Sequence, residues 1–206
     1  MKLFLLSDTQ NFNKDLKSKL GDELKMAGNR IAYISSAKQT GDMIYYQTAI
    51  KEFQNINSDI EIDYFDLSPE VSDNELDKIK TYKIIYLSGG NTFTFLNDAN
   101  NRKLHTRLRD FLNAGGVLLG ASAGSIMMTP KIDIASLGDE NLVELKDTTS
   151  FNFVNFEFHP HYIESDLQVL EQYKKTTGNK IYLCKDGDGI FYNNGEVILF
   201  GDIKSI

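Results

Sequence analysis

The sequence contains a single cysteine, Cys184, and this scarcity excludes an internal disulfide bond. A chain without disulfides suits a reducing compartment, so we expect a cytoplasmic protein. The sequence also lacks any apolar run near the ~20 residues that a membrane-spanning helix needs. Its first apolar stretch, residues 1–6, is too short for a secretory signal. A membrane is therefore not an expected partner.

Positive charge is scarce as well, with 22 Lys and Arg residues against 29 Asp and Glu residues and a formal net charge of -7 at pH 7. The basic residues are scattered among carboxylates and form no basic stripe, so nucleic acid is not an expected partner. At 206 residues the chain has the size of one domain and can bury a core without disulfides or metal. We expect a single domain over residues 1–206. The oligomeric state stays open, with a homodimer as one option.

Short apolar runs alternate with amphipathic stretches over the first 120 residues. The runs predict strands at residues 2–6, 30–34, 60–65, 83–87 and 117–119. The amphipathic stretches predict helices at residues 12–28, 44–53, 72–79, 91–96 and 104–112. Residues 35–37 open a loop after the second strand. The alternation predicts an α/β fold of three layers, in which a mostly parallel sheet is covered by helices on both faces.

The last third of the chain is less regular. Residues 131–150 carry few periodic signals, residues 151–158 alternate as a strand does, and residues 167–173 predict a helix. Further strands are expected at residues 181–184, 190–192 and 197–200. Asn-Asn-Gly at 193–195 predicts a hairpin turn. We therefore expect a small antiparallel C-terminal appendix at one edge of the sheet.

A glycine turn after the strand at 117–119 is the first candidate for chemistry. Its pattern is Gly-x-Ser-x-Gly, with Ser122 between Gly120 and Gly124. The active sites of parallel α/β sheets lie at the carboxyl ends of their strands, and this pattern at a strand-to-helix turn exposes the serine as a nucleophile. The structural alternative is a turn of small residues that only lets a helix pack closely against the sheet.

Backbone donors for an oxyanion are expected beside this serine. The N–H of Ala123 follows the serine directly, and an earlier turn, Gly89-Gly90-Asn91, offers a second donor at Gly90. We expect Gly89 and Asn91 to border the substrate as part of the same turn. A tight turn before a helix, without a binding role, is the alternative for this segment.

A serine nucleophile needs a neighbouring base, usually a histidine. His105 lies beside two arginines on the polar side of its predicted helix, so we expect a solvated surface residue. His159 and His161 flank a proline at the end of the strand predicted at 151–158, and the proline stiffens their turn. One of this pair is the expected base. Further ligands for a metal cannot be placed, so we expect neither a metal nor another cofactor.

The base in turn needs a carboxylate on its other ring nitrogen. Asp139, Asp186 and Asp188 all lie in predicted loops. Spacing alone does not choose among them, and for each one a solvated loop position is the alternative.

Four segments together resemble the dipeptidase E family of serine peptidases (peptidase S51), which is related to cyanophycinase. The segments are residues 87–93, 120–125, 158–162 and, more weakly, 186–190. The family is similar to class I glutamine amidotransferases with serine in place of cysteine, which implies a flavodoxin-like fold. The resemblance implies Ser122 as nucleophile and His161 as base, because the family's histidine follows the proline. It also implies Gly90 and Ala123 as oxyanion donors and places His159 where the dipeptidase has asparagine.

For the acid, the resemblance implies either Asp139 or a carboxylate near the C terminus that best matches Asp186, and Asp188 stays open. It also implies an arginine-containing segment soon after the histidine that holds an aspartate side chain of the substrate. This chain has Glu-Ser-Asp-Leu-Gln at 164–168 instead, and no arginine follows Arg109. Because an acidic lining repels an aspartyl side chain, we do not expect strict specificity for Asp-X peptides.

The sequence therefore predicts a serine hydrolase that cleaves a peptide or amide bond of a small substrate through an acyl-enzyme at Ser122. Two alternatives remain. Gly-x-Ser-x-Gly also marks esterases of the α/β-hydrolase fold, although their histidine usually follows the last strand and several predicted strands follow His161 here. The second alternative is a non-catalytic small-molecule-binding protein on the same scaffold.

Overall fold

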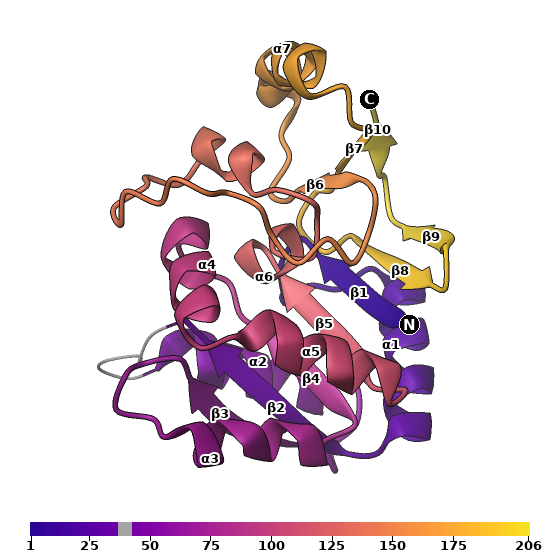
Figure 1. Ribbon diagram of the computed structural model, residues 1–206. Coiled ribbons are helices and arrows are strands. Elements are labelled where there is room, and N and C mark those ends of the chain that lie inside the picture. Colours follow the sequence, from indigo (N-terminus) through magenta and orange to yellow (C-terminus); the bar gives the residue numbers. More distant parts are fainter. Residues whose placement is uncertain (37–42) are drawn as a thin grey trace.

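In the computed structural model, which describes residues 1–36 and 43–206, a central seven-stranded sheet has the order β3-β2-β4-β5-β1-β8-β9 (Figure 1). Strands β1 to β5 run parallel, whereas β8 is antiparallel to β1 and β9 to β8. The bounds are β1 (Lys2–Leu6), β2 (Arg30–Ser35), β3 (Glu61–Asp66), β4 (Ile84–Leu87), β5 (Val117–Ala121), β8 (Gly189–Asn193) and β9 (Glu196–Phe200). The predicted mostly parallel sheet is confirmed. The loop predicted to open at 35–37 runs into residues 37–42, which lie outside the described residues.

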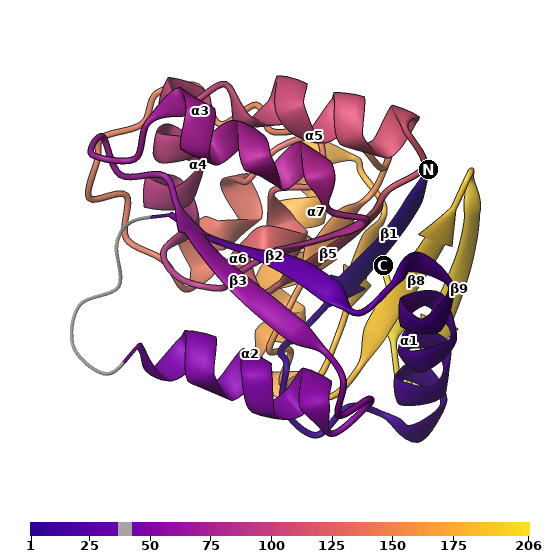
Figure 2. The same ribbon diagram turned by 90° about the horizontal axis from the view of Figure 1, so that it is seen from below.

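Helices cover both faces of this sheet, which gives three layers (Figure 2). One face carries α1 (Lys14–Ala27) and α2 (Ile44–Gln54), and the other carries α3 (Asp73–Leu76), α4 (Thr92–Asn101) and α5 (Leu104–Asn113). Along β1, Phe4 and Leu6 belong to the apolar cluster under α1 and α2, while Leu3 and Leu5 belong to the cluster on the other face. Burial on both faces explains why these strands are continuous apolar runs in the sequence.

A second sheet, with the order β10-β7-β6, lies beyond the carboxyl ends of the parallel strands (Figure 1). It contains β6 (Glu157–His159), β7 (Ile181–Leu183) and β10 (Lys204–Ser205), and α7 (Leu167–Thr177) lies above it. The antiparallel appendix is confirmed for β8 and β9, which the predicted hairpin joins. The prediction of an antiparallel appendix is wrong for β7. This strand lies between β6 and β10 in the second sheet, and it pairs with β6 in parallel.

The strand predicted at 151–158 is wrong for most of its length, since only its end forms β6. The N–H groups of Phe151 and Phe153 donate to carbonyls just after the short helix α6 (Ala123–Ile126), so they are not available to a neighbouring strand. The inside-outside alternation fails as well, because Phe153 and Val154 are both buried although they are adjacent.

The remaining helical turns are of the 3-10 type and span Asp77–Thr81, Asp133–Leu137 and Glu164–Asp166. The segment 131–150 forms one of these turns, and its ends meet in a bridge between Lys131 and Thr149. Cys184 is buried. In the part of the chain that the structure describes, no helix combines the length and apolarity that crossing a membrane requires.

Candidate active site

Ser122 occupies the sharp turn between β5 and α6. Its φ of 51° and ψ of -114° lie in a backbone region that residues with a side chain rarely adopt. A Cβ on Gly124 would come within 2.4 Å of the Leu87 carbonyl oxygen, and one on Gly120 within 2.5 Å of the Gly124 backbone. The glycines therefore let α6 begin directly against β4, which holds the serine at the carboxyl end of the central strand β5.

His161 faces Ser122 from the turn after β6. Its Nε2 lies 2.9 Å from Ser122 Oγ, and its Nδ1 lies 2.6 Å from Asp186 Oδ1. An ionised aspartate can only accept a hydrogen bond, so Nδ1 carries the proton and Nε2 accepts from the serine hydroxyl. The side chains of His161 and Asp186 are 50% and 61% exposed, which leaves the pair open to a small molecule.

Ser7, which sequence reasoning missed, binds both members of this pair. Its Oγ accepts from the backbone N–H of His161 at 2.7 Å, and it lies in donor range of Asp186 Oδ1 at 3.0 Å and of the Cys184 carbonyl at 3.2 Å. Ser7 is 0% exposed and directly follows β1, the strand beside β5. Its place at the carboxyl end of a central parallel strand is the signal that could have found it.

The loop that carries Asp186 is bound to the segment after β1. The N–H of Gly187 donates to Asp8 Oδ1 at 2.9 Å, and the Gly187 carbonyl accepts from the N–H of Asn13 at 2.7 Å. Gly187 has a φ of 85°, and a Cβ there would lie 2.6 Å from the Asn11 carbonyl oxygen. Burial raises the pKa of Asp8, and the nearby charge of Asp186 acts in the same direction. Hydrogen bonds thus hold the carboxylates of Asp8 and Asp186 close together.

The other two candidate acids lie elsewhere. Asp139 Oδ2 accepts from the N–H and the hydroxyl of Thr92, at 2.8 Å and 2.6 Å, and so binds the start of α4. Asp188 Oδ2 accepts from the N–H of Asp202 at 3.1 Å, and burial raises the pKa of its carboxyl. Sequence spacing did not choose among the three candidate acids. Of the three, Asp186 is the one whose carboxylate contacts His161.

The glycine turn after β4 lies against the serine. A Cβ on Gly89 would be 3.6 Å from the Cβ of Ser122, and Gly90 has a φ of 133°, a conformation that favours glycine. The N–H of Gly124 donates to the Ser88 carbonyl at 3.1 Å, so the two turns are joined by their backbones. This contact brings the expected oxyanion turn and the nucleophile turn to one place.

The side chain of Asn91 binds two backbone groups near this turn. Its Oδ1 accepts from the N–H of Thr94 at 3.0 Å as the N-cap of α4, and its Nδ2 donates to the Glu140 carbonyl at 2.8 Å. Ala123, the residue after the serine, is buried as the first residue of α6.

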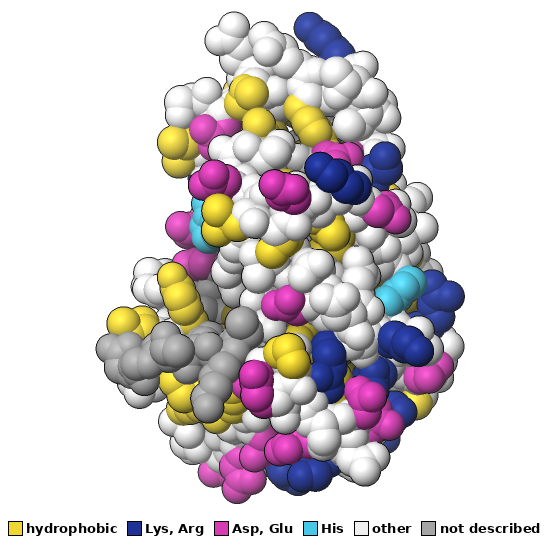
Figure 3. Space-filling model, turned by 60° about the vertical axis from the view of Figure 1, so that its left-hand side comes forward, with side chains coloured by type: hydrophobic (Ala, Val, Ile, Leu, Met, Phe, Trp, Pro, Cys, Tyr) yellow, Lys and Arg dark blue, Asp and Glu magenta, His cyan; other side chains and the backbone are white. Residues whose placement is uncertain are grey.

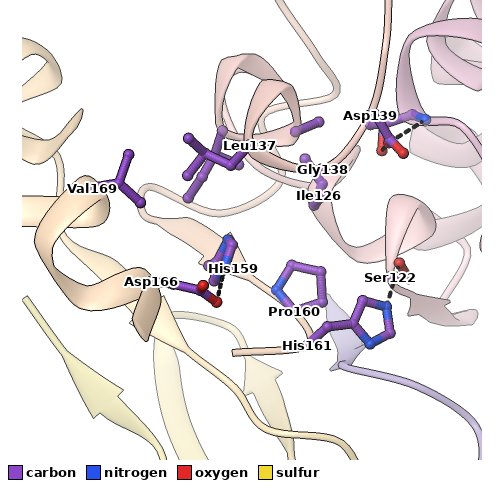
Figure 4. Close-up of a pocket in the computed structure, with 13 residues that line it drawn as sticks. Ser122, Ile126, Leu137, Gly138, Asp139, His159, Pro160, His161, Asp166 and Val169 are labelled. Atoms are coloured by element: carbon purple, nitrogen blue, oxygen red, sulfur yellow. Dashed lines mark hydrogen bonds and ion pairs between the residues drawn. The ribbon is translucent and has the colours of Figure 1, made fainter. Parts of the chain in front are cut away.

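Two cavities share Ser122 and His161 in their walls. The smaller cavity has a volume of about 330 Å³ and extends toward His159 and Asp139 (Figure 4). The larger has about 540 Å³, and it is bordered by the turn Gly89-Gly90-Asn91, by Asp186 and by Tyr33, Tyr45 and Tyr86. A substrate that reaches the serine hydroxyl therefore has room for groups in two directions.

His159 lines the smaller cavity but does not bind the serine. Its Nε2 lies 3.7 Å from Asp166 Oδ2, and burial lowers the pKa of its ring. Of the two histidines around the proline, His161 is thus the one that contacts Ser122. Among the residues that the structure describes, no three His, Cys, Asp or Glu side chains are grouped to hold a metal ion.

His105 lies partly exposed at the surface beside Arg109, as predicted, but one side of its ring is covered. Its ring stacks on Phe151 with centroids 5.4 Å apart and an angle of 14° between the planes, and burial lowers the pKa of the imidazole. This stacking was not predicted because the course of the segment around Phe151 was missed.

Comparison with known proteins gives a consistent family signal. A model described as Peptidase family S51 matches residues 3–200. An uncharacterized peptidase of Pasteurella multocida is 27% identical over 194 residues, which cover 88% of this chain and 91% of that protein. Peptidase E of Nostoc sp. is 29% identical over 170 residues, which cover 78% of this chain and 65% of that protein.

Solved structures share the fold. A crystal structure from Listeria monocytogenes EGD-e has a TM-score of 0.79 at 24% identity and covers 96% of both chains. A peptidase from an acI-B1 Actinobacterium has a TM-score of 0.67 at 13% identity and covers 100% of this chain and 93% of its own.

Proposed function

The chain belongs to peptidase family S51 and is a serine-class peptidase, and from this premise we propose that Ser122 is its nucleophile, His161 its base and Asp186 the orienting acid. The observation that carries the proposal is the unbroken series of contacts from Ser122 Oγ through both ring nitrogens of His161 to Asp186 Oδ1. Family membership also favours a peptidase over the esterase and the non-catalytic alternatives.

In the proposed reaction, His161 Nε2 takes the proton of Ser122 as Oγ bonds to the carbonyl carbon of the substrate. The tetrahedral intermediate then collapses, the bond from carbon to nitrogen breaks, and the leaving amine takes the proton from His161. Water attacks the resulting ester in the same way and releases the acid. Asp186 keeps Nδ1 protonated and stabilises the imidazolium that forms in each step.

We assign the oxyanion donors to the N–H groups of Ala123 and Gly90. Support comes from the hydrogen bond that joins the two turns, from the N–H of Gly124 to the Ser88 carbonyl, and from the open space that a Cβ on Gly90 would meet. Backbone donors fixed in advance stabilise the negative oxygen without reorganising, which is a large part of catalysis in this class of reaction.

The substrate of this proposal is a short peptide or a related amide, since one cavity of about 330 Å³ and one of about 540 Å³ border the serine. The reaction as written needs no cofactor. A cytoplasmic location completes the proposal, because the one cysteine is buried and unpaired, as suits a reducing compartment.

A panel of dipeptides tests the proposal, with released amino acids as the readout. Wild type is expected to cleave members of the panel, and Ser122→Ala and His161→Ala are each expected to lose roughly 10³-fold or more in kcat. A fluorophosphonate is expected to label wild type once, at Ser122, and to leave Ser122→Ala unlabelled. Equal turnover by wild type and Ser122→Ala would end the assignment, and hydrolysis of p-nitrophenyl acetate without any dipeptide cleavage would favour an esterase.

A further inference from the structure

The smaller cavity beside Ser122 has apolar walls and polar ends. In Figure 4, Ser122 lies at one side of the cavity, while Asp166 and Val169 lie at the opposite side. The walls between them consist of Ile126, Ile134, Ala135, Leu137 and Pro160. A volume of about 330 Å³ is at the low end for ligand pockets, so the cavity suits one side chain of a substrate rather than a whole peptide.

The charged groups of this cavity are carboxylates. Among the described residues that line it there is no lysine or arginine. Asp139 is already bound by the N–H and hydroxyl of Thr92. Asp166 Oδ2 accepts from the N–H of Ile163 at 3.1 Å, and 29% of the Asp166 side chain is exposed. Because burial lowers the pKa of His159, its ring is neutral at pH 7 and does not cancel the charge of Asp166.

Cations of neighbouring segments are bound to other carboxylates. Lys204 contacts both oxygens of Glu164, at 2.7 Å and 2.8 Å, and Lys185 contacts Asp202 at 2.6 Å. On the face in Figure 3, Asp and Glu side chains lie beside a histidine at the upper left, whereas at the lower right Lys and Arg side chains are mixed with Asp and Glu. The charge of Asp166 is therefore left to act on whatever enters the cavity.

On the premise that Ser122 is the nucleophile, we propose that this cavity accepts a side chain with an apolar stem and a cationic end, as in lysine or arginine, next to the cleaved bond. The methylene stem packs against the apolar walls, and the cationic end reaches Asp166. An anionic side chain of similar length meets like charge in a partly desolvated site and is rejected. Asp166 is thus the residue that determines specificity in this cavity.

Six dipeptides test the inference: Lys-Ala, Leu-Ala and Asp-Ala, and the same three residues in second position as Ala-Lys, Ala-Leu and Ala-Asp. In at least one of the two positions, kcat/KM for lysine is expected to exceed that for aspartate by about tenfold or more, the ratio that a difference of ~1.4 kcal/mol produces. The leucine peptides fill the same walls without charge, so their cleavage reports the proposed peptidase activity independently of Asp166.

A charge-neutral variant sharpens this test. Asp166→Asn keeps an acceptor for the N–H of Ile163 and removes the charge, so kcat/KM for the preferred lysine peptide is expected to fall about fivefold while the leucine peptides are unaffected. Glu171→Gln, which removes an exposed carboxylate of α7 that lines neither cavity, is the matched control and is expected to leave kcat/KM for both the lysine and the leucine peptides unchanged.

The two proposals fail in different ways. Cleavage of leucine peptides with aspartate equal to or better than lysine in both positions overturns the cationic preference and leaves the peptidase intact. The same holds if Asp166→Asn lowers lysine and leucine peptides equally. No cleavage of any peptide by wild type overturns the proposed function and this inference together.

Discussion

Ser122 and His161, the proposed nucleophile and base, come from two regions that are held in place by different physical means. Ser122 lies in the turn between β5 and α6. A Cβ on either flanking glycine would lie 2.4 Å or 2.5 Å from backbone atoms of neighbouring segments, so the turn is tightly packed on both sides of the serine. His161 and Asp186 sit in exposed turns and are held by hydrogen bonds to Ser7 and to the segment after β1. Steric contacts thus fix the position of Ser122, whereas single polar groups fix the position of His161.

This contrast predicts opposite sensitivities. A substitution in the serine turn other than at Ser122 is expected to act mainly on stability, whereas the loss of one hydroxyl or carboxylate beside His161 is expected to change the rate without unfolding the protein. The substitutions below are chosen to test each side of that contrast.

The largest effect is expected at Asp186. In Asp186→Asn the amide no longer holds Nδ1 in its protonated form, so we expect kcat to fall by roughly 10³ to 10⁴, the range known for this type of change. Asp188→Asn is the matched control, because Asp188 accepts from the N–H of Asp202, does not contact His161 and lines neither cavity, and its kcat is expected to stay within about threefold of wild type. The measurement is steady-state kinetics on the best dipeptide, and an equal loss in both variants would contradict the assignment of the acid.

The sequence indicated the serine turn and the sheet because both depend on local patterns. A strand that is buried on two faces is a run of consecutive apolar residues. The Gly-x-Ser-x-Gly turn and the proline turn that carries His161 are likewise recognised from adjacent residues. The acid was left open because the contact between Asp186 and His161 joins segments that are apart in the chain, and loop spacing does not encode it. Ser7 was missed for the same reason: its role appears only when the end of β1 meets residues from the last third.

The errors have a related cause. Residues 151–158 show the apolar pattern of a strand, but their backbone donors bind the turn after α6 instead. The stacking of the His105 ring on Phe151 was missed as a consequence, because Phe151 belongs to that segment. Periodicity reports which side chains are apolar, while the partner of a backbone N–H is decided by packing of distant segments.

A large effect on stability is expected in the sterically fixed region. In Gly124→Ala the new Cβ meets the Leu87 carbonyl oxygen at 2.4 Å, so β4 and α6 must separate, and we expect a loss of about 3 kcal/mol in the free energy of unfolding. Gly138→Ala is the control, because a Cβ there meets nothing within 4 Å. Urea denaturation gives both values, and similar midpoints for the two variants would show that the turn is not fixed by these contacts.

A moderate effect on rate is expected at Ser7. In Ser7→Ala the His161 backbone and the Asp186 carboxylate lose a common partner, and a buried hydrogen bond of this kind is worth roughly 1–3 kcal/mol, so we expect kcat to fall by about 10- to 100-fold with little change in KM. The control is Ser125→Ala, a buried serine that binds the Leu6 and Gly120 backbones. This control is expected to lose stability but to keep most of its kcat. If Ser7→Ala and Ser125→Ala lost the same stability and also the same kcat, Ser7 would have a structural role only.

The smallest effect is expected at Asp8, which lies beside the loop of Asp186. Burial raises the pKa of Asp8 above its usual value of 3.8, so the folded state holds this proton more tightly than the unfolded state does. Stability therefore falls as pH rises from 3.8 through the folded-state pKa, and the cost is fully present at neutral pH. Asp8→Asn keeps an acceptor for the N–H of Gly187 and removes this cost, so its Tm is expected to exceed that of wild type slightly at pH 7 and to converge with it below pH 3.8. Melting curves over this pH range test the sign, with Asp22→Asn on the exposed side of α1 as control. If the Tm gain of Asp8→Asn over wild type instead grew as pH falls, the folded state would favour the charged form of Asp8. The hydrogen bond from the N–H of Gly187 to Asp8 would then outweigh the repulsion between Asp8 and Asp186.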